Sequence, residues 1–324
     1  MPPTLPDPEL QRWFERRTFP RSARSTSQLA DLKRAAGVSV SLCLPALNER
    51  ATVGSICRSI RTDLMERTPV VDELVVVDSG SDDGTAEEAA AAGAVVHHVG
   101  DILPAVPKSA MGGKGETLWR SLAVLHGDVV VWMDSDTRNF TPRFVVDLLD
   151  PLLTDASIGF VKAFYDRPLQ TGEHVLGTGG ARVTELVARP MLQLFYPQLT
   201  GFVQPLSGEC AARREWLLDV PFSTGYGVEI GLLLDLVEAH GLDALAQADL
   251  GVRVHRNQDV PALGRMAHQV LCAMLVRFDR LGRLKLTDEP STTLTQFRPG
   301  EDGPESTTSE LAITDRPPMG PLLA

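Results

Sequence analysis

Short apolar runs alternate with helical segments over residues 38–133, and this rhythm limits the fold more than any other feature of the sequence. The apolar runs lie at 38–44, 73–77, 94–99 and 128–133, and the segments with helical spacing lie at 51–64, 84–92 and 115–125. Strands that alternate with helices in this way are typical of parallel sheets. The sequence therefore predicts an α/β fold with a mainly parallel, doubly wound sheet and helices on both faces.

The remainder of the chain is less regular. Helices are expected at 144–153, 181–194, 227–240 and 260–281, and extended segments at 158–164 and 245–254. Residues 1–37 predict a loosely held arm with one or two helical turns, pinned by Trp13 and Phe14. Residues 287–324 are rich in Pro, Ser, Thr, Gly and acidic residues, which predicts a disordered or surface-draped tail. One domain, residues 38–286, is left between the arm and the tail.

The charge balance excludes some classes of partner. The chain has 42 acidic and 31 basic residues, a net charge of −11. Binding to nucleic acid or to an anionic membrane generally needs a basic face, so neither partner is expected. No apolar run approaches the ~20 residues that span a bilayer, and the polar start of the chain has no secretory apolar core. Four widely spaced cysteines indicate reduced thiols, as in a cytoplasmic protein.

Polar clusters follow three of the expected strands: PALNE at 45–49, DSGSDDGT at 78–85 and DSD at 134–136. Ligands of open α/β sheets bind beyond the carboxyl ends of the strands, so the three clusters should line one edge. Asp134 and Asp136 can offer hard oxygen ligands to a divalent cation such as Mg²⁺, which commonly bridges carboxylates and phosphates. The alternative is a turn that caps the next helix, but the polar neighbours on adjacent strand ends favour the metal.

The other two loops carry two interpretations each. The backbone of PALNE and Glu49 can hold a uracil and a ribose, or the loop can simply end a strand with Asn48 capping the next helix. In the second loop, Asp78 and Ser79 can take hydrogen bonds from base or ribose, whereas residues 82–85 are typical of a turn with a helix cap.

Cationic residues are the second requirement for anionic substrates. Lys114 lies between two glycines at the start of a helix, a good position for a diphosphate, although an exposed lysine in a loop also fits. Arg182 and Thr184 follow the glycine-rich stretch 177–180 at another helix start; this is a carboxylate or phosphate site or, equally well, a solvated arginine.

Two further groups complete the candidate site. His255 lies in a basic polar segment with Arg253 and Asn257; it is either a structural histidine or, if it faces the Asp136 cation, a neutral metal ligand. Glu229 begins an apolar helix, where it is either a helix-start acid or an acceptor for sugar hydroxyls.

In this order, the segments resemble those of glucosyl-3-phosphoglycerate synthases, which are retaining glycosyltransferases of the GT-A fold. The resemblance runs from about residue 38 to residue 319 and includes PALNE, VVDSGSDDGT, GKGETLWRSLA, DSD, GGARVTELVARP, QPLSGE, GYGVEIGLL, LGVRVHRN, LTQF and DRPPM. It implies UDP-glucose as donor, D-3-phosphoglycerate as acceptor, Mg²⁺ or Mn²⁺ as cofactor and a homodimer. It also divides the domain into a nucleotide-sugar-binding half, 38–137, and a less regular acceptor-binding half, 138–286.

The resemblance assigns roles residue by residue. The donor-binding residues are Pro45, Ala46, Leu47, Asn48, Glu49, Ser79, Lys114, Asp134, Ser135, Tyr226, Gly227, Val228, Glu229 and Arg253. The acceptor-binding residues are Ala181, Arg182, Val183, Thr184 and Asn257. The metal ligands are Asp136 and His255, and the catalytic residues are Asp136, Glu229 and Lys114.

Two positions depart from the family pattern. Arg50 replaces an expected glutamate at the start of a helix, where we expect little effect. Ala181 replaces an expected glycine; if that position needs a positive φ, the loop is strained and acceptor affinity falls.

Other functions fit parts of the pattern. A mannosyl-3-phosphoglycerate synthase would use GDP-mannose through a different base and sugar pocket. A polyprenyl-phosphate sugar transferase would need a membrane-facing element, which the sequence does not display. A catalytically inactive nucleotide-sugar sensor would lack metal or acceptor residues, whereas the matching residues are present.

Arg182 gives a test of the acceptor site. We expect Arg182→Lys to raise the KM for 3-phosphoglycerate at least tenfold, on the order of 1.4 kcal/mol, because lysine cannot copy the planar fork of a guanidinium. The Kd for UDP-glucose should barely change, since the donor lies at the other loops. Equal damage to both affinities would assign Arg182 to the fold. If neither affinity changed, the anion site would lie elsewhere, with Arg253 and Arg256 as the next candidates.

Overall fold

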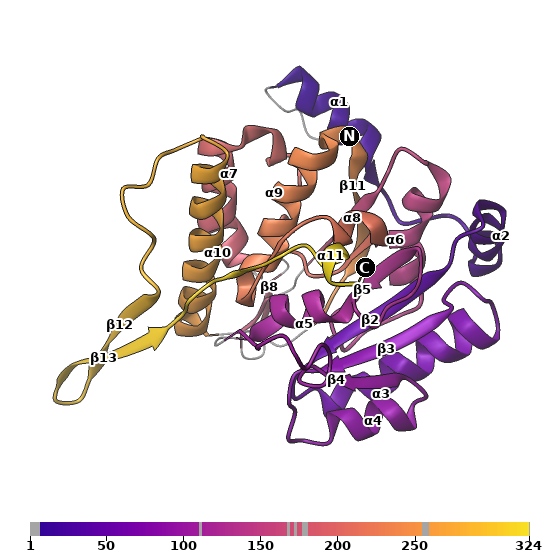
Figure 1. Cartoon of the computed structure of the whole chain (residues 1–324), viewed down its shortest axis with the longest axis horizontal. Coiled ribbons are helices and arrows are strands. Elements are labelled where there is room, and N and C mark those ends of the chain that lie inside the picture. Colours follow the sequence, from indigo (N-terminus) through magenta and orange to yellow (C-terminus); the bar gives the residue numbers. More distant parts are fainter. Residues whose placement is uncertain are drawn as a thin grey trace.

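The structure, a computed structural model, describes residues 7–109, 112–166, 169–171, 174–176, 181–254 and 259–323. Within these residues an eight-stranded sheet has the order β1-β11-β6-β9-β5-β2-β3-β4 (Figure 1). Its strands are β1 Thr18–Phe19, β2 Val40–Ala46, β3 Glu73–Asp78, β4 Val95–His98, β5 Val129–Trp132, β6 Phe160–Asp166, β9 Cys210–Arg213 and β11 Leu245–Val252. Neighbouring strands are parallel except at β9, which is antiparallel to both β5 and β6. The expected mainly parallel sheet is confirmed.

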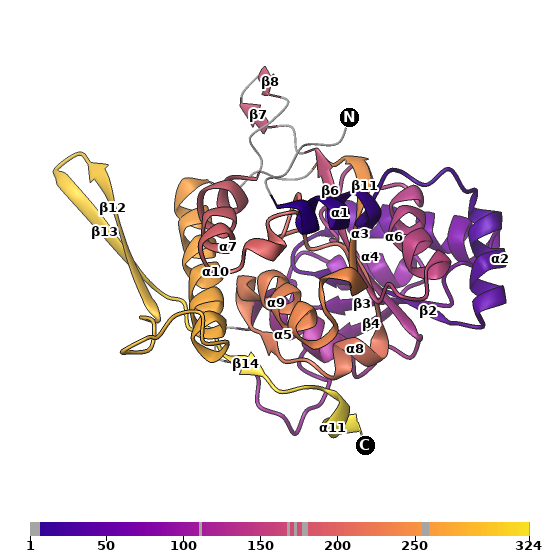
Figure 2. The ribbon, with the colours of Figure 1, turned by 90° about the horizontal axis from the view of Figure 1, so that it is seen from above.

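Helices cover both faces of the sheet, because the strands are apolar on both sides. One core packs the sheet against α2 Thr26–Ala36, α3 Arg50–Ile60, α4 Thr85–Ala91 and α6 Arg143–Thr154. The other core packs it against α1 Pro8–Arg17, α5 Gly113–Ser121, α7 Arg189–Phe195, α8 Arg214–Leu218, α9 Val228–His240 and α10 Val260–Arg280. Figures 1 and 2 show α7, α9 and α10 of this second group together at the end of the molecule away from α2.

Short elements complete the described chain. Two expected helices end or begin with π-helical turns: η1 Arg61–Glu66 follows α3, and η2 Thr184–Ala188 precedes α7. The remaining elements are β7 Leu169–Thr171, β8 His174–Leu176, η3 Pro197–Leu199, β10 Phe222–Ser223, η4 Gly225–Gly227, η5 Leu242–Ala244 and α11 Gly320–Leu323. Strand β9 was not expected from the sequence, because four residues of composition CAAR have neither a clear apolar period nor a strong strand propensity.

The N-terminal arm is more ordered than the sequence suggests. It forms α1, β1 and α2, and β1 extends the sheet by pairing with β11. Trp13 is buried against Phe202, and its indole Nε1 donates to the carbonyl oxygens of Leu242 and Leu245 at 3.0 and 3.1 Å. Trp13 therefore does pin the arm. The polar composition of the arm suggested a loosely held segment, but its arginines pair with carboxylates of the body, such as Arg17 with Asp155 at 2.6 Å.

The C-terminal tail also forms defined elements. Strands β12 Thr293–Gly300 and β13 Gly303–Glu310 make an exposed hairpin that projects from the body beside α10 (Figures 1 and 2). Strand β14 Asp315–Arg316 then pairs with β10, and Met319 is buried. Of the two expectations for the tail, disorder or draping over the surface, the structure shows an ordered segment at the surface for residues 287–323, held by strand pairing and by the buried Leu311 and Met319.

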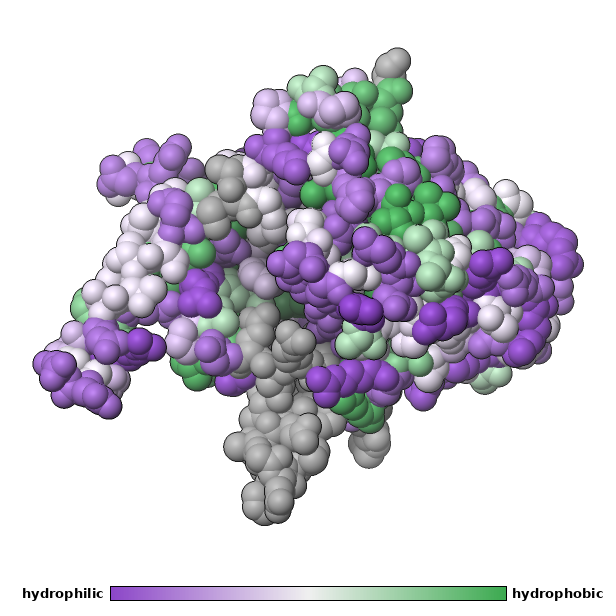
Figure 3. Space-filling view, turned by 90° about the horizontal axis from the view of Figure 1, so that it is seen from below, coloured by the Kyte–Doolittle hydropathy of each residue, from purple (hydrophilic) through white to green (hydrophobic). Residues whose placement is uncertain are grey.

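The surface agrees with the composition. On the face in Figure 3 the described residues are largely hydrophilic, and hydrophobic residues gather only in small groups. Among the helices that the structure describes, none combines the length and apolarity needed to cross a membrane.

Candidate active site

The three polar clusters meet at one edge of the sheet, as the parallel strands require. Ala46 at the end of β2 is in register with Asp78 at the end of β3. The hydroxyl of Ser135, just past β5, donates to the carbonyl oxygen of Pro45 at 2.7 Å. Thr52 on α3 donates to the carbonyl oxygen of Ser135 at 2.6 Å. The loops after β2, β3 and β5 therefore form one continuous rim.

The first two rim loops are tied together by hydrogen bonds. Asn48 has a φ of 57°, and its side-chain oxygen accepts from the N–H of Asp82 at 3.1 Å, so it does not cap α3. Its own N–H donates to the hydroxyl of Ser81 at 2.9 Å. Asp78 is buried, and its carboxylate accepts from the N–H groups of Gly80 and Ser81. Asp78 is thus committed to the shape of the loop.

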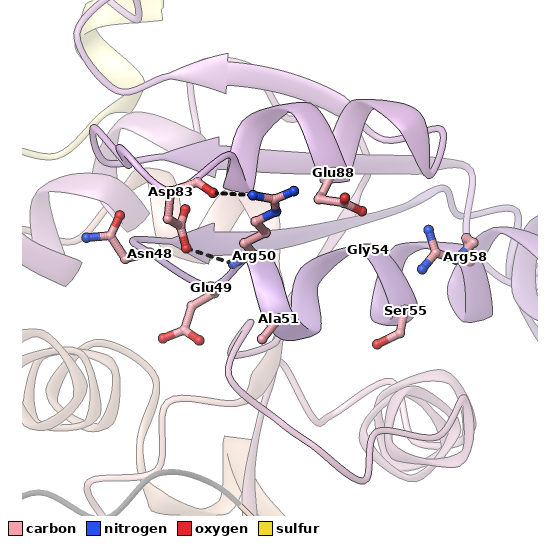
Figure 4. Close-up of a pocket in the computed structure, with 9 residues that line it drawn as sticks. All are labelled: Asn48, Glu49, Arg50, Ala51, Gly54, Ser55, Arg58, Asp83 and Glu88. Carbon is pink, nitrogen blue, oxygen red and sulfur yellow. Dashed lines mark hydrogen bonds between the residues drawn. The ribbon is translucent and has the colours of Figure 1, made fainter.

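The remaining predicted residues of these loops are placed as follows. Leu47 is exposed, Glu49 is half-buried, and the Ser79 hydroxyl lies 2.8 Å from that of Thr117. Figure 4 shows the carboxylate of Glu49 and the guanidinium of Arg50 pointing to opposite sides of the start of α3. Arg50 reaches Asp83, with its N–H on Oδ2 at 3.2 Å and its Nη1 on the carbonyl oxygen at 3.3 Å. The unusual arginine therefore joins α3 to the second rim loop, on the side of the helix opposite to the carboxylate of Glu49.

The glycines on either side of Lys114 are needed for close backbone packing, which the sequence alone does not reveal. A Cβ on Gly115 would lie 1.9 Å from the carbonyl oxygen of Ser223, and one on Gly113 would lie 3.0 Å from the Cα of Gly225. The N–H of Gly225 also donates to the carbonyl oxygen of Gly112 at 3.2 Å. The start of α5 thus packs backbone to backbone against the segment that leads into α9. This packing brings Lys114 to Glu229.

Lys114 and Arg253 hold Asp134 between them. The Lys114 ammonium lies 2.5 Å from Oδ1 of Asp134 and 3.0 Å from Oε1 of Glu229. Arg253 Nη2 lies 3.0 Å from the other oxygen of Asp134 and 2.7 Å from Oδ1 of Asp136. We call Lys114, Asp134, Asp136, Glu209, Glu229 and Arg253 the charge cluster.

Both cations stay charged in spite of their burial. Burial opposes the charge of Lys114, but the carboxylates of Asp134 and Glu229 outweigh it and hold the pKa of the lysine well above its ordinary value. Burial also opposes the charge of Arg253, which is 2% exposed, yet Glu209 and its other anionic neighbours raise the pKa of the guanidinium. The cluster is therefore an array of fixed charges at the rim.

Strand β9 brings a further carboxylate to this rim. Because β9 runs antiparallel to its neighbours, the residue before it, Glu209, lies at the edge where β5 and β6 end. Oε1 of Glu209 lies 2.9 Å from Nε of Arg253, and Oε2 accepts from the hydroxyl of Tyr165 at 2.8 Å. The Tyr165 hydroxyl in turn accepts from Nη1 of Arg253 at 2.9 Å. Glu209 and Tyr165 were given no role from sequence, although the segment QPLSGE marked the position.

Lys162 is another residue that sequence reasoning missed. It is buried in β6, in register with Cys210 of β9, and burial lowers the pKa of its ammonium. The sequence did contain a signal for this residue, because a lysine inside the apolar run FVKAFY is unusual for a buried strand.

Asp134 and Asp136 differ in how their carboxylates are occupied. Lys114 and Arg253 contact both oxygens of Asp134, whereas in the described part of the chain Asp136 is contacted by Arg253 through one oxygen alone. The second oxygen of Asp136 and the carboxylate chemistry fit a hard divalent cation. His255 and Asn257 lie outside the described residues, and no cluster of three or more metal-binding side chains occurs among the rest.

The acceptor residues lie before and within η2. Val183 and Thr184 are buried, and Ala181 and Arg182 are half-buried. Ala181 does not have a positive φ, so the strain considered for an alanine at this position is absent. The glycines at 177–180 lie outside the described residues, and the predicted anion site at this helix start stays a prediction.

The Tyr226–Glu229 segment lies across from the start of α5, where Glu229 meets Lys114. Gly225–Gly227 is a 3₁₀ turn that leads into α9, and the N–H of Tyr226 donates to the side-chain oxygen of Gln269 at 3.0 Å. The Tyr226 side chain is exposed, whereas Val228 is fully buried in the core. Any contact of Val228 with a donor therefore uses its backbone.

Comparison with known proteins identifies the family. The sequence model described as "Glycosyl transferase family 2" matches residues 41–217. The chain belongs to glycosyl transferase family 2. This family 2 chain is 42% identical over 315 residues to the glucosyl-3-phosphoglycerate synthase of Petrotoga mobilis, covering 97% of this chain and 95% of the relative. It is 49% identical over 292 residues to that of Mycobacterium tuberculosis, covering 88% and 86% of the two chains.

Solved structures agree. Glucosyl-3-phosphoglycerate synthase from Mycobacterium tuberculosis, in complex with Mn²⁺, UDP and phosphoglyceric acid, matches with a TM-score of 0.82 and 46% identity over 94% of this chain and 98% of that one. Mannosyl-3-phosphoglycerate synthase from Rubrobacter xylanophilus matches with a TM-score of 0.87 and 37% identity over 97% and 98%. The resemblance to the glucosyl-3-phosphoglycerate synthases and the GT-A-type α/β fold are confirmed for this family 2 chain.

Two helical glycines test the packing at Lys114. We expect Gly115→Ala to lower the melting temperature and to weaken UDP binding, because its methyl group would overlap the backbone at Ser223. In Gly54→Ala the nearest atom is Oε2 of the Glu88 side chain, 3.1 Å away, which can move. Since alanine is the better helix former by about 1 kcal/mol, that control should be neutral or stabilising. Thermal melts and UDP titrations decide; equal behaviour of the two variants contradicts the explanation.

Proposed function

We propose that this family 2 chain transfers glucose from UDP-glucose to D-3-phosphoglycerate, giving glucosyl-3-phosphoglycerate and UDP. The observation that carries the proposal is the charge cluster, in which Lys114 and Arg253 converge on the DxD carboxylates at the donor edge of the sheet. Relatives called glucosyl-3-phosphoglycerate synthase match almost the whole chain, and the structure of one was solved with UDP-glucose and phosphoglyceric acid. Residues 38–137 form the donor half and residues 138–286 the acceptor half.

A divalent cation, Mg²⁺ or Mn²⁺, is the cofactor in this proposal. Structures of the Mycobacterium tuberculosis relative contain Mn²⁺ or Mg²⁺ together with UDP. In this chain Asp136 and His255 would hold the ion, and Asp134 and Ser135 would lie beside it against the nucleotide-sugar. When bound, the ion supplies positive charge against a diphosphate leaving group.

The residues of the chain perform the rest of the chemistry. UDP leaves as an anion, and the charged Lys114 and Arg253 stabilise the negative charge that develops on its phosphate. Glu229 accepts hydrogen bonds from sugar hydroxyls while its other contact with Lys114 fixes its position. Arg182, Thr184 and Asn257, with the backbone at Ala181 and Val183, bind the anionic acceptor.

Retention of configuration follows from front-side attack in this proposal. The acceptor oxygen forms its bond to the anomeric carbon on the face from which UDP departs, and the hydroxyl proton passes to the departing phosphate oxygen. Glu229, the one carboxylate considered as a nucleophile, is paired at 3.0 Å with Lys114, which lowers its nucleophilicity. This favours its role as a hydrogen-bond acceptor.

A second donor is favoured by one observation, the close structural match to a protein called a mannosyl-3-phosphoglycerate synthase. Purified protein should therefore be assayed with UDP-glucose, GDP-glucose and GDP-mannose, with and without 3-phosphoglycerate and Mg²⁺. We expect turnover with UDP-glucose only when acceptor and metal are both present. A preference for GDP-mannose would change the donor, and UDP release that needs no acceptor would remove the acceptor. Binding without turnover for every donor would indicate an inactive nucleotide-sugar-binding protein.

The metal role of Asp136 can be tested directly. We expect Asp136→Ala to abolish turnover and to remove the metal dependence of UDP binding, since a lost ligand removes several kcal/mol of charge stabilisation. Asp101→Ala, which changes an exposed carboxylate outside the cluster, is the matched control. Undiminished activity of the Asp136 variant, or of the wild type in EDTA, would contradict the assignment.

A cytoplasmic homodimer completes the proposal. Large hydrophobic side chains are exposed on η2, α7, α10 and the β12–β13 hairpin. They are Leu186, Leu194, Val260, Val276 and Phe297. Gln296 of β12 donates to the carbonyl oxygen of Pro261 at 3.2 Å, which holds the hairpin to the start of α10. Exposed hydrophobic side chains on an otherwise hydrophilic surface favour association.

Sedimentation equilibrium tests the dimer. We expect twice the chain mass for the wild type and a shift towards monomer for Phe297→Asp, because Phe297 is 74% exposed on the hairpin. Val95→Asp, at the opposite edge strand β4, should leave the mass unchanged. A monomeric wild type would contradict the proposed dimer. A dimeric Phe297→Asp variant would show that the interface does not include Phe297.

A further inference from the structure

A segment near the end of the chain runs along the outside of α5. We call residues 314–319 the strap; in Figures 1 and 2 this yellow segment runs from the region of α10 past α5. Its strand β14 pairs with β10, and Thr314 and Thr224 exchange hydrogen bonds of 3.0 and 2.9 Å through their backbones and a side chain. Met319 is buried. The strap is thus an integral part of the folded body.

Asp315 fixes the strap to the segment that leads into α9, the helix that carries Glu229. Its Oδ1 accepts from the hydroxyl of Ser223 at 2.7 Å and lies 3.3 Å from Nη1 of Arg277. Arg277 is fully buried and also pairs with Asp235 at 2.8 Å. Ser223 lies just before the turn that leads into α9.

Arg316, the next residue, fixes the strap to the helix that carries Lys114. Its Nε and Nη2 bind the two oxygens of Glu116 at 2.6 and 2.8 Å, the planar fork that only arginine offers. Nη2 also donates to the carbonyl oxygen of Pro107 at 2.7 Å. Trp119 lies under the guanidinium and donates from its indole to the carbonyl oxygen of Pro317 at 2.8 Å.

Glu116 is the centre of this contact. It is 2% exposed, lies in the first turn of α5 two residues after Lys114, and also accepts from Nε of Arg120 at 2.7 Å. Arg120 donates to the carbonyl oxygens of Leu103 and Val106, in the loop that leads to Lys114. One buried carboxylate thus holds the helix, the loop before it and the strap.

Two adjacent strap residues of opposite charge therefore bind the two elements that carry Lys114 and Glu229. Arg316 binds α5, and Asp315 binds the segment before α9. We propose that Arg316 and Glu116 are positioning residues for the donor: they hold Lys114 where it meets the diphosphate of the nucleotide-sugar. This inference rests on the proposed function for the identity of the donor. A buried ion pair adds little to stability compared with apolar packing, so a role in geometry explains its presence.

The test separates donor positioning from general stability. The variants are Arg316→Gln, Arg316→Lys, Glu116→Gln and the double Gln variant, and Arg298→Gln, in an exposed pair with Glu305 on the hairpin, is the control. UDP affinity is measured by calorimetry with Mn²⁺, beside the KM for each substrate and the melting temperature. For Arg316→Gln we expect the Kd for UDP and the KM for UDP-glucose to rise roughly tenfold, and the KM for 3-phosphoglycerate to change less than about twofold.

The other variants sharpen the result. Arg316→Lys should lie between the wild type and Arg316→Gln, since lysine keeps the charge and loses the fork. The double variant should be no worse than the worse single variant, because both changes remove the same contact. The control should match the wild type.

Two outcomes would overturn the proposal. An unchanged Kd for UDP in both Arg316 variants would leave the strap without a role at the donor site. Parallel losses of donor and acceptor affinity with a lower melting temperature would assign Arg316 to the fold. If the wild type binds UDP but does not turn over UDP-glucose, the proposed function fails, while the UDP titration of the variants still decides the role of the strap.

Discussion

Asp134 lies between the half-buried Lys114 and the buried Arg253, and the organisation of the donor edge depends on this contact. Lys114 comes from the start of α5, and Arg253 follows the last strand of the sheet, 119 residues after Asp134. Without Asp134, the ammonium of Lys114 and the guanidinium of Arg253 would lack the carboxylate that separates them, although each keeps another carboxylate partner. The members of the charge cluster therefore support one another, and α5, β5 and β11 are constrained at a single point.

The cluster also resolves an electrostatic problem. A chain with a net charge of −11 repels anions at long range. Lys114 and Arg253 are kept charged by carboxylates that surround them, as the raised pKa values of both residues indicate. Two cations are thus held at one rim without a basic surface, among four carboxylates that leave the charge cluster with a formal charge of −2, which a divalent cation would neutralise.

Close backbone packing provides the second constraint. Gly113 and Gly115 allow α5 to approach the segment before α9, and the strap then closes over both through Asp315 and Arg316. The antiparallel direction of β9 has a similar effect, because it places Glu209 at the edge where the parallel strands end. Residues from four distant parts of the chain meet in this way around Lys114.

The sequence by itself determined the parallel part of the sheet and the position of the rim. Apolar runs and turn residues are local signals, and parallel strands necessarily bring the loops at 45–49, 78–85 and 134–136 to one edge. The place of β9, the order of the arm and the strap, and the contacts of Glu209 and Glu116 come from the tertiary structure alone. Their stability comes from ion pairs and backbone contacts between residues far apart in the chain, such as Arg316 with Glu116, 200 residues away. Such contacts leave no periodicity in the sequence, because each depends on where the rest of the fold places its partner.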